Sequence, residues 1–367
     1  MNMAYADQLA RKQARLAELI GVPVPPIVPS PRQTAFRQKS AFVFGSTRGR
    51  GLTMGHYATG SRQIVSVDEC PVHSDRANRI AFALRDRLAR ANIPAADRPN
   101  GILRHVIIRT TEDDREAVAM LVVTRNDKSL RTPVRGFLAS ADAPDGFFIN
   151  INDRPGPLMV GDETIKISGR SHVREKGISG IGGASAVDFL VSPDAFFQTN
   201  VGAARELVRL VLEGVGPAKR VLDLYCGSGL FALPLARGGA TVTAIEENRQ
   251  AIDDLKANAR LNRIPPAQVV PIAARVEDAI ARVSKTAWDA VVLDPPRDGC
   301  APGVLEAIVD RIAPPRIVYV SCDPKALSRE LPILRNRNAG YRIDRVVAVD
   351  MFPHTDHIEA VMTLSRG

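Results

Sequence analysis

Long apolar segments are absent from this chain of 367 residues. No window holds the roughly 18 uninterrupted apolar residues that a membrane-spanning helix needs, which excludes that class of protein. The N-terminal stretch MNMAYADQLARKQARLAELIG has the pattern of a charged amphipathic helix. It lacks the apolar block and the small-residue cleavage site of a signal peptide. We therefore expect a cytoplasmic protein with no membrane partner.

Cysteine is also scarce, and no two cysteines stand close together. Cys70, Cys226, Cys300 and Cys322 are the only four, and none forms a C-x-x-C pair. This spacing suggests neither a disulfide framework nor a zinc or iron–sulfur cage, so each cysteine needs its own explanation.

The charge is unevenly distributed along the chain. The net charge is +9; residues 1–190 carry 27 basic and 19 acidic residues, whereas residues 191–367 carry 22 and 21. A basic excess in the first half fits a polyanionic partner, above all nucleic acid, and it also fits an ordinary soluble basic surface.

The sequence pattern predicts two domains after an N-terminal segment. A helix and a proline-rich linker occupy residues 1–32, and short β-like runs with one helix near 75–91 predict an α+β domain over 33–190. From residue 191 to 367, strands and helices alternate as in a doubly wound α/β sheet, and the last two strands follow one another closely. We expect a mostly parallel, Rossmann-like sheet with an antiparallel end. No internal repeat is visible.

A glycine loop follows the first strand of the α/β half. In VLDLYCGSGLFALPLA, Gly227 and Gly229 let the backbone approach a ligand closely. Asp223, inside the strand, favours S-adenosylmethionine over a dinucleotide. Glu246, at the end of TVTAIE, is placed to accept hydrogen bonds from ribose hydroxyls. Enzymes that use NAD share this device, so an NAD-dependent oxidoreductase is one alternative, and a strand-end acid on the surface is another.

The fourth strand of that half ends in WDAVVLDPPRDG. Asp294 and the two stiff prolines place a carboxylate over the reactive end of a cofactor. Amino-methylating enzymes usually have an aromatic residue after the prolines, whereas Arg297 stands here. An arginine favours a phosphate or a uracil-like acceptor.

Cys322 stands where the strand RIVYVS turns into a helix that begins at Asp323-Pro324. Aspartate is a good N-cap, and proline is a good first helical residue. The helix N-terminus favours a thiolate and is expected to lower the pKa of Cys322, although Asp323 opposes it. A small buried hydrophobe is the other interpretation of a free cysteine.

A thiolate beside a methyl donor suggests one reaction in particular. Addition to carbon 6 of a uracil makes carbon 5 nucleophilic, and after methyl transfer a base must remove the carbon 5 proton. DMFPHTDHIEAVMTL supplies Glu359 as the candidate base, at the start of the last strand. His354, His357 and Glu359 could alternatively bind a metal, but no fourth ligand is evident.

These motifs together resemble the RNA uracil-5-methyltransferase family. FFQTN, DLYCGSG, AIE, DPPRDG, SCDPKALSREL and DMFPHTDHIE stand in the family's order over residues 191–367, and SVDECPVH and LRHVIIR resemble its central RNA-facing domain. The resemblance implies Cys322 as nucleophile, Glu359 as proton acceptor, and S-adenosylmethionine as cofactor. It also implies a cofactor pocket lined by Gln198, Tyr225, Glu246 and Asp294.

The chain departs from the rRNA-modifying members in two ways. Cys70 is the only cysteine before Cys226, so we expect no iron–sulfur cluster, and the short N-terminal helix leaves no room for an added OB-like domain. We expect a monomer that methylates a uridine in structured RNA, with 23S rRNA favoured over tRNA. An RNA cytosine-5 methyltransferase, which would show Pro-Cys after the fourth strand, and a non-catalytic RNA-binding factor are the alternatives.

Overall fold

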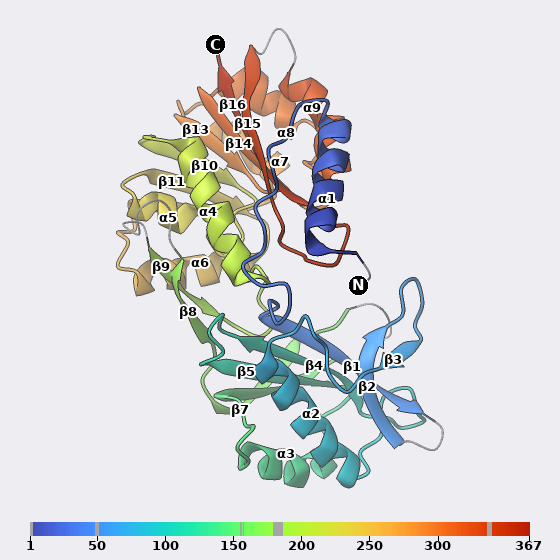
Figure 1. Cartoon of the computed structure of the whole chain (residues 1–367). Helices are drawn as coiled ribbons and strands as arrows, with labels where there is room; N and C mark the ends of the chain where they lie inside the picture. The colour runs from blue at the N-terminus through green and yellow to red at the C-terminus, as the bar shows by residue number, and fades with distance from the viewer. Residues whose placement is uncertain (1–2, 48–50, 155, 157, 179–185, 336–339) are drawn as a thin grey trace. The chain divides into compact units, whose positions relative to one another are not determined.

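The computed structural model describes residues 3–47, 51–154, 156, 158–178, 186–335 and 340–367 (Figure 1). The chain forms two compact units. One, the α/β unit, holds Met1–Gln33, Lys176–Phe189 and Phe196–Gly367; the other, the α+β unit, holds Thr34–Glu175 and Leu190–Ala195. The chain therefore passes between the units more than once.

The α/β unit is built on a seven-stranded sheet with the order β12-β11-β10-β13-β14-β16-β15. The first five strands in this order are parallel, and β16 runs antiparallel to both of its neighbours. The predicted doubly wound sheet with an antiparallel end is confirmed. The strands are β10 (Arg220–Leu224), β11 (Thr241–Glu246), β12 (Val269–Ala273), β13 (Ala290–Leu293), β14 (Arg316–Ser321), β15 (Tyr341–Val349) and β16 (Glu359–Arg366).

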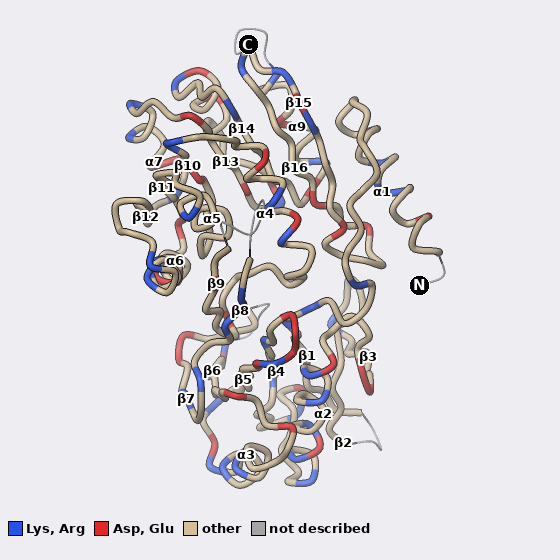
Figure 2. The backbone as a smooth tube through the Cα atoms, turned by 60° about the vertical axis from the view of Figure 1, so that its left-hand side comes forward, with Lys and Arg blue, Asp and Glu red and all other residues tan. Residues whose placement is uncertain are grey.

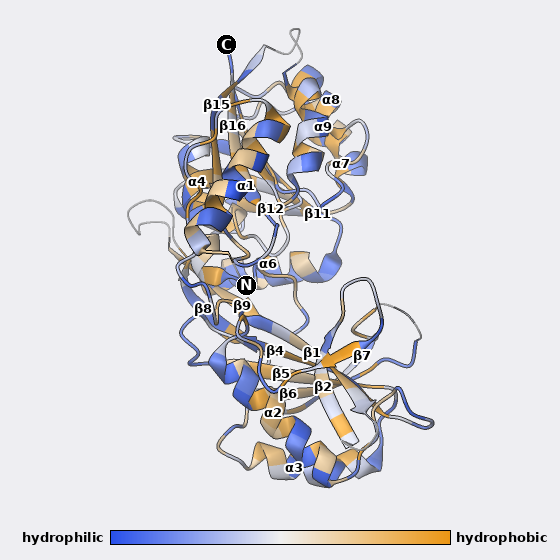
Figure 3. Cartoon of the chain, turned by 45° about the vertical axis from the view of Figure 1, so that its right-hand side comes forward, coloured by the Kyte–Doolittle hydropathy of each residue, from blue (hydrophilic) through white to orange (hydrophobic). Residues whose placement is uncertain are grey.

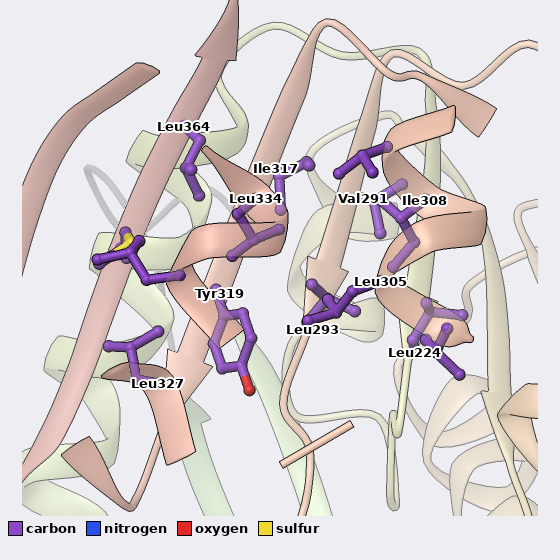
Figure 4. Packing of buried hydrophobic residues seen from close by; sticks show 14 of the residues in the cluster. Leu224, Val291, Leu293, Leu305, Ile308, Ile317, Tyr319, Leu327, Leu334 and Leu364 are labelled. Carbon is purple, nitrogen blue, oxygen red and sulfur yellow. The ribbon is translucent and has the colours of Figure 1, made fainter. Parts of the chain in front are cut away.

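Two groups of helices cover the two faces of this sheet. Alternate strand residues such as Leu293 and Tyr319 pack with residues of α8, η3 and α9, as Figure 4 shows, and residues of α7 belong to the same cluster. Val318 on the other face lies against α4. Because helices cover both faces of the parallel strands, polar and apolar residues do not have to alternate along them, which explains their apolar sequences. The helices are α4 (Val201–Val215), α5 (Ala232–Arg237), α6 (Arg249–Leu261), α7 (Val276–Val283), α8 (Val304–Glu306), the π-type turn η3 (Ala307–Ile312) and α9 (Pro324–Leu334).

The N-terminal segment belongs to the α/β unit. Helix α1 (Tyr5–Ile20) places Leu16 and Ile20 in the core beside α9. It ends at Gly21, whose left-handed φ of 67° suits glycine and whose N–H donates to the Ala17 carbonyl. The proline-rich linker then runs along β15, where Val28 forms a parallel bridge with Val349.

The α+β unit contains a second seven-stranded sheet, with the order β3-β2-β1-β4-β5-β6-β7. Only β5 and β6 are parallel, because η1 (Lys128–Leu130) and α3 (Arg131–Leu138) connect them as a crossover. Helix α2 (Asp75–Arg90) packs its apolar face on the sheet and keeps hydrophilic residues on its outer side (Figure 3). The strands are β1 (Lys39–Thr47), β2 (Gly51–Tyr57), β3 (Ile64–Ser66), β4 (Leu103–Thr110), β5 (Ala117–Val123), β6 (Gly146–Ile151) and β7 (Glu163–Gly169).

A small two-stranded sheet pairs β8 (Val173–Ile178) with β9 (Val187–Val191). Most of the glycine-rich stretch between them, residues 179–185, lies outside the described residues. Among the helices that the structure describes, none is both long and apolar enough to cross a lipid bilayer.

Candidate active site

The predicted site residues gather at one edge of the α/β sheet. In a parallel sheet the carboxyl ends of the strands meet at the same edge, where ligands bind. Glu246 is the last residue of β11, Asp294 follows β13 directly, and Cys322 follows β14. Glu359 begins the antiparallel strand β16 at the same edge, because Ala360 pairs with Ser321.

The glycine loop after β10 is tied to Glu246. The two carboxylate oxygens of Glu246 accept hydrogen bonds from the backbone N–H of Gly227 at 3.2 Å and of Asn248 at 2.9 Å. Gly227 has φ +53°, and a β-carbon there would meet no atom within 4 Å, so the space above it is open. Gly229 has φ +94°, which residues with side chains rarely adopt, and a β-carbon there would also lie only 3.0 Å from Leu233. The loop leaves room for a ligand beside a fixed carboxylate.

Tyr225 links this loop to the loop after β13. It has φ +63°, which is costly for a residue with a side chain and marks a position where function often justifies strain. Its hydroxyl accepts the N–H of Ala301 at 3.3 Å. Burial, together with Cys300, raises its pKa.

Buried carboxyl groups accumulate beneath the loop. Asp223 is fully buried, and neither of its side-chain oxygens has a hydrogen bond of normal geometry among the described residues, although the Ala232 N–H lies near enough to lower its pKa. Burial and then Asp294 nevertheless raise the pKa of Asp223 well above its usual value. Burial raises the pKa of Asp294 to about 7. A buried carboxyl group such as Asp223 either keeps its proton or pairs with a cation.

Cys322 lies among acidic groups as well. Burial, Glu359 and Asp294 raise its pKa to about 11, and Arg297 lowers it. The same arginine lowers the pKa of Glu359, which burial and Asp294 raise well above the usual range. Cys322, Glu359, Asp294 and Arg297 therefore form one electrostatic group.

The expected lowering of the Cys322 pKa is wrong for the protein without ligands. The predicted helix start is present: Asp323 caps α9 by accepting the Lys325 N–H at 2.9 Å, and Pro324 is the first helical residue. Burial of the sulfur, Glu359 and Asp294 nevertheless raise the pKa of Cys322 more than Arg297 and its backbone hydrogen bond lower it.

Gln198 is half-buried, and no hydrogen bond within the described part of the chain joins it to the other predicted residues. Two residues later, Asn200 caps α4 by accepting the Ala203 N–H at 3.1 Å, and its amide donates to the Met351 carbonyl at 3.1 Å. The FFQTN motif is thus fastened to the loop that leads to Glu359.

The loop at residues 350–358 is held by contacts from helix α1 that we call the clamp. The sequence did not predict these contacts. Lys12 of α1 donates to Asp350 at 2.7 Å and to the Phe352 carbonyl at 3.1 Å, and Tyr5 donates to the other oxygen of Asp350 at 2.8 Å. Lys12 and Asp350 are 5% and 1% exposed. The side chain of Gln8 holds His354 in place through one hydrogen bond to its backbone N–H and another to its ring nitrogen. A lysine within an exposed-looking helix gives no sequence signal for such a role.

Replacing Lys12 with methionine should lower the free energy of unfolding by about 3 kcal/mol, because the Asp350 charge stays buried without its cation. Urea titration followed by the fluorescence of Trp288, the single tryptophan, reports this unit. Arg11→Met is the matched control: Arg11 meets Asp356 at 3.9 Å with both side chains mostly exposed, so its loss should cost under about 0.5 kcal/mol. Equal effects of the two substitutions would contradict the clamp.

His354 and His357 approach the site without forming a metal group. Among the described residues, their ligand atoms and those of Glu359 do not come close enough together to hold an ion. Burial, then Arg297 and Lys12, lower the pKa of His357, which places this ring beside the cationic side of the site.

The C-terminal half matches known proteins along its whole length. The profile of the tRNA (uracil-5-)-methyltransferase family matches residues 184–367. The chain belongs to this family. It is 32% identical to an uncharacterized RNA methyltransferase of Thermosynechococcus vestitus, over 100% of this chain and 81% of that protein. It is 33% identical to another from Geobacter sulfurreducens, over 99% of this chain and 74% of that protein.

A solved structure agrees with this assignment. The tRNA (uracil-54, C5)-methyltransferase of Pyrococcus abyssi, in complex with S-adenosyl-L-homocysteine, superimposes with a TM-score of 0.82 at 29% identity, over 99% of this chain and 84% of that one. The protein is accordingly an S-adenosylmethionine-dependent RNA uracil-5-methyltransferase with a Rossmann-like fold. The NAD-dependent alternative is wrong.

Proposed function

We propose that the enzyme methylates carbon 5 of one uridine in a structured RNA through a covalent adduct with Cys322, and that Glu359 removes the carbon 5 proton. The observation that supports this is the placement of the thiol and the carboxyl group at one sheet edge, where Glu359 contributes to the raised pKa of Cys322. A nucleophilic sulfur and a base are the two groups that addition at carbon 6 and loss of the carbon 5 proton require.

The steps follow from the chemistry of the two side chains. The Cys322 thiolate adds to carbon 6, and the electron pair of the carbon 5–carbon 6 bond moves into an enolate. S-adenosylmethionine, when bound, supplies a methyl group on a cationic sulfur. Once carbon 5 bears the methyl group, the Glu359 carboxylate takes its proton, the ring double bond forms again, and the sulfur leaves as thiolate.

Arg297 prepares both groups for this work. It lowers the pKa of Cys322 and of Glu359, and so favours the thiolate and the carboxylate that the steps require. The raised pKa of Glu359 makes it a stronger base than an exposed carboxylate once it is ionised. Any further positive charge in the site would, like Arg297, lower the pKa of both Cys322 and Glu359.

The proposed cofactor contacts rest on two structural features. Glu246 still has lone pairs for the ribose hydroxyls, since each oxygen accepts only one backbone N–H. Asp223 and Asp294 provide negative charge for a cation, and the open space above Gly227 admits the ligand. We assign Tyr225 and Gln198 to the same pocket by the family's pattern.

Replacing Glu246 with alanine should weaken S-adenosylmethionine binding about 10- to 100-fold, because hydrogen bonds to a charged group contribute about 1.5–3 kcal/mol. Equilibrium dialysis measures this directly. Glu247→Ala is the control, since Glu247 is the next residue and is exposed. Equal binding by both variants would remove Glu246 from the pocket.

Cofactor affinity should rise between about pH 5.5 and 7, because Asp294 has its pKa raised to about 7 and must lose its proton to pair with a cation. Isothermal titration at several pH values, in buffers of different ionisation enthalpy, measures the released proton. S-adenosylhomocysteine, whose sulfur is neutral, should show the weaker dependence. An affinity that is flat over this range would contradict the linkage.

Arginines of the α+β unit are proposed to hold RNA phosphates. Helix α2 carries five, along its length in Figure 2, and Arg79 and Arg90 are exposed. Phosphate contacts of this kind fix position and carry no sequence information, while the target base must leave its stack to reach Cys322. We expect a monomeric enzyme to suffice.

Mapping 5-methyluridine in tRNA and 23S rRNA from a deletion strain tests the function. The sequence favoured 23S rRNA, whereas the solved relative is named for tRNA, so both RNAs belong in one experiment. Loss of one modified uridine names the substrate. Loss of 5-methylcytidine instead would favour the cytosine alternative, and no loss of either would favour a non-catalytic RNA-binding factor.

A further inference from the structure

Three metal-ligating side chains meet in the α+β unit, whereas Cys322 belongs to the α/β unit. His56 comes from β2, and Cys70 and His73 come from the turn between β3 and α2. Their ligand atoms all lie within 4.8 Å of one another. We propose that His56, Cys70 and His73 bind one divalent transition-metal ion of the zinc class.

The turn that carries two of the ligands is firmly built. The His73 N–H donates to the Cys70 carbonyl at 3.1 Å, which brings the two side chains of a C-x-x-H sequence together. Asn78 of α2 holds Cys70 from both sides: it accepts the Cys70 N–H at 3.1 Å and donates to the Cys70 carbonyl at 3.0 Å. Ser74 then caps α2 through the Ala77 N–H at 3.1 Å. A preformed turn reduces the entropy cost of binding an ion.

Each of the two imidazoles has a buried nitrogen that lacks a hydrogen-bond partner among the described residues. These are Nδ1 of His73, which is 4% exposed, and Nε2 of His56. A buried polar atom left unsatisfied costs about 1–3 kcal/mol, so two in one cluster indicate a missing partner. The rings are fixed against Phe42, with His56 stacked at 5.0 Å and His73 edge-on at 4.8 Å.

A neutral imidazole nitrogen is a common metal ligand in proteins, and His56 and His73 each present one to the cluster. Arg37 opposes metal binding, because its guanidinium lies near Cys70 and repels a cation. The thiolate formed on metal binding compensates this charge in part.

The ligand set selects the class of ion. One thiolate and two imidazoles suit zinc, or cobalt as its substitute, and do not suit calcium or magnesium. Bonds of about 2.0–2.3 Å in a tetrahedron require the widest ligand separations to close by about 1 Å. The described residues supply three ligands, which leaves a fourth position for water or a small anion. The ion would connect β2 to the start of α2.

Cobalt(II) titration of the full chain, after chelator treatment and dialysis, tests the proposal. We expect one equivalent to bind with a thiolate-to-cobalt charge-transfer band, and zinc to displace it. Cys70→Ser should abolish the band, and His56→Ala, at a less buried position, should weaken binding at least about 100-fold. Cys300→Ser and His172→Ala are matched controls outside the cluster and should bind as the unaltered chain does.

A measurement on the unaltered chain guards against variants that fail to fold. Zinc should raise its melting temperature relative to chelator, and anomalous scattering at the zinc edge should place the ion between the three side chains. Absence of the cobalt band would overturn the proposal, as would a band that survives Cys70→Ser or disappears in Cys322→Ala. The cluster would then be a packed aromatic group only.

Discussion

Methylation by the Cys322→Ala enzyme should fall by about 10⁴-fold or more, because without the sulfur carbon 5 of the uracil is not nucleophilic. The rate is measured as transfer of labelled methyl groups to the substrate RNA in single turnover. Cofactor binding should change little, since Cys322 carries none of the proposed cofactor contacts. The fold should also remain, because Asp323 still caps α9 and Pro324 still begins it.

The control for this substitution is Cys300→Ser, which removes another half-buried thiol from the same unit. It should keep its methylation rate within a few-fold. Full activity of Cys322→Ala would disprove nucleophilic catalysis. RNA containing 5-fluorouridine gives an independent readout, since fluorine cannot leave carbon 5 as a proton, and the adduct with Cys322 should persist.

The Glu359→Gln enzyme should accumulate a methylated covalent adduct with RNA and turn over about 10²–10⁴-fold more slowly, the usual contribution of a positioned base. Glutamine keeps the shape of the side chain but cannot take the carbon 5 proton, so the sulfur cannot leave. The adduct appears as a protein band of reduced mobility on a denaturing gel, and it should carry label from the methyl donor.

Stability offers a second check on the same variant. Removing a carboxyl group from the buried site should not destabilise the protein, because Asp294 already opposes the charge of Glu359. Asp356→Asn, in the same loop and mostly exposed, is the control and should form no adduct. A Glu359→Gln enzyme with normal turnover would show that another group takes the proton.

Much of the α/β unit followed from the sequence. Strand and helix periods, the cap at Asp323, and the sheet-edge positions of Asp294 and Cys322 are local signals, and the structure confirms those elements. The catalytic and cofactor roles of the site residues stay predictions. The domain boundaries at residues 32 and 190 also stay predictions.

What the sequence could not give depends on contacts between distant residues. Lys12 and Asp350 are 338 positions apart, and neither carries a motif. The sign of the Cys322 pKa shift depends on burial, which a helix N-cap does not reveal. Strand β2 gives only a weak strand pattern, because GLTMGHY contains two glycines. The sequence therefore did not indicate that His56 lies beside Cys70.

The clamp between α1 and the loop before β16 has a consequence for the order of folding. A chain is synthesised from its N-terminus, and contacts of high sequence separation form late. Lys12 emerges first and stays without its carboxylate until Asp350 has left the ribosome. Glu359 lies beyond Asp350, so the proposed base enters the site only when nearly the whole chain is present. A nascent chain of this enzyme therefore has no complete active site, whichever of its strands have already paired.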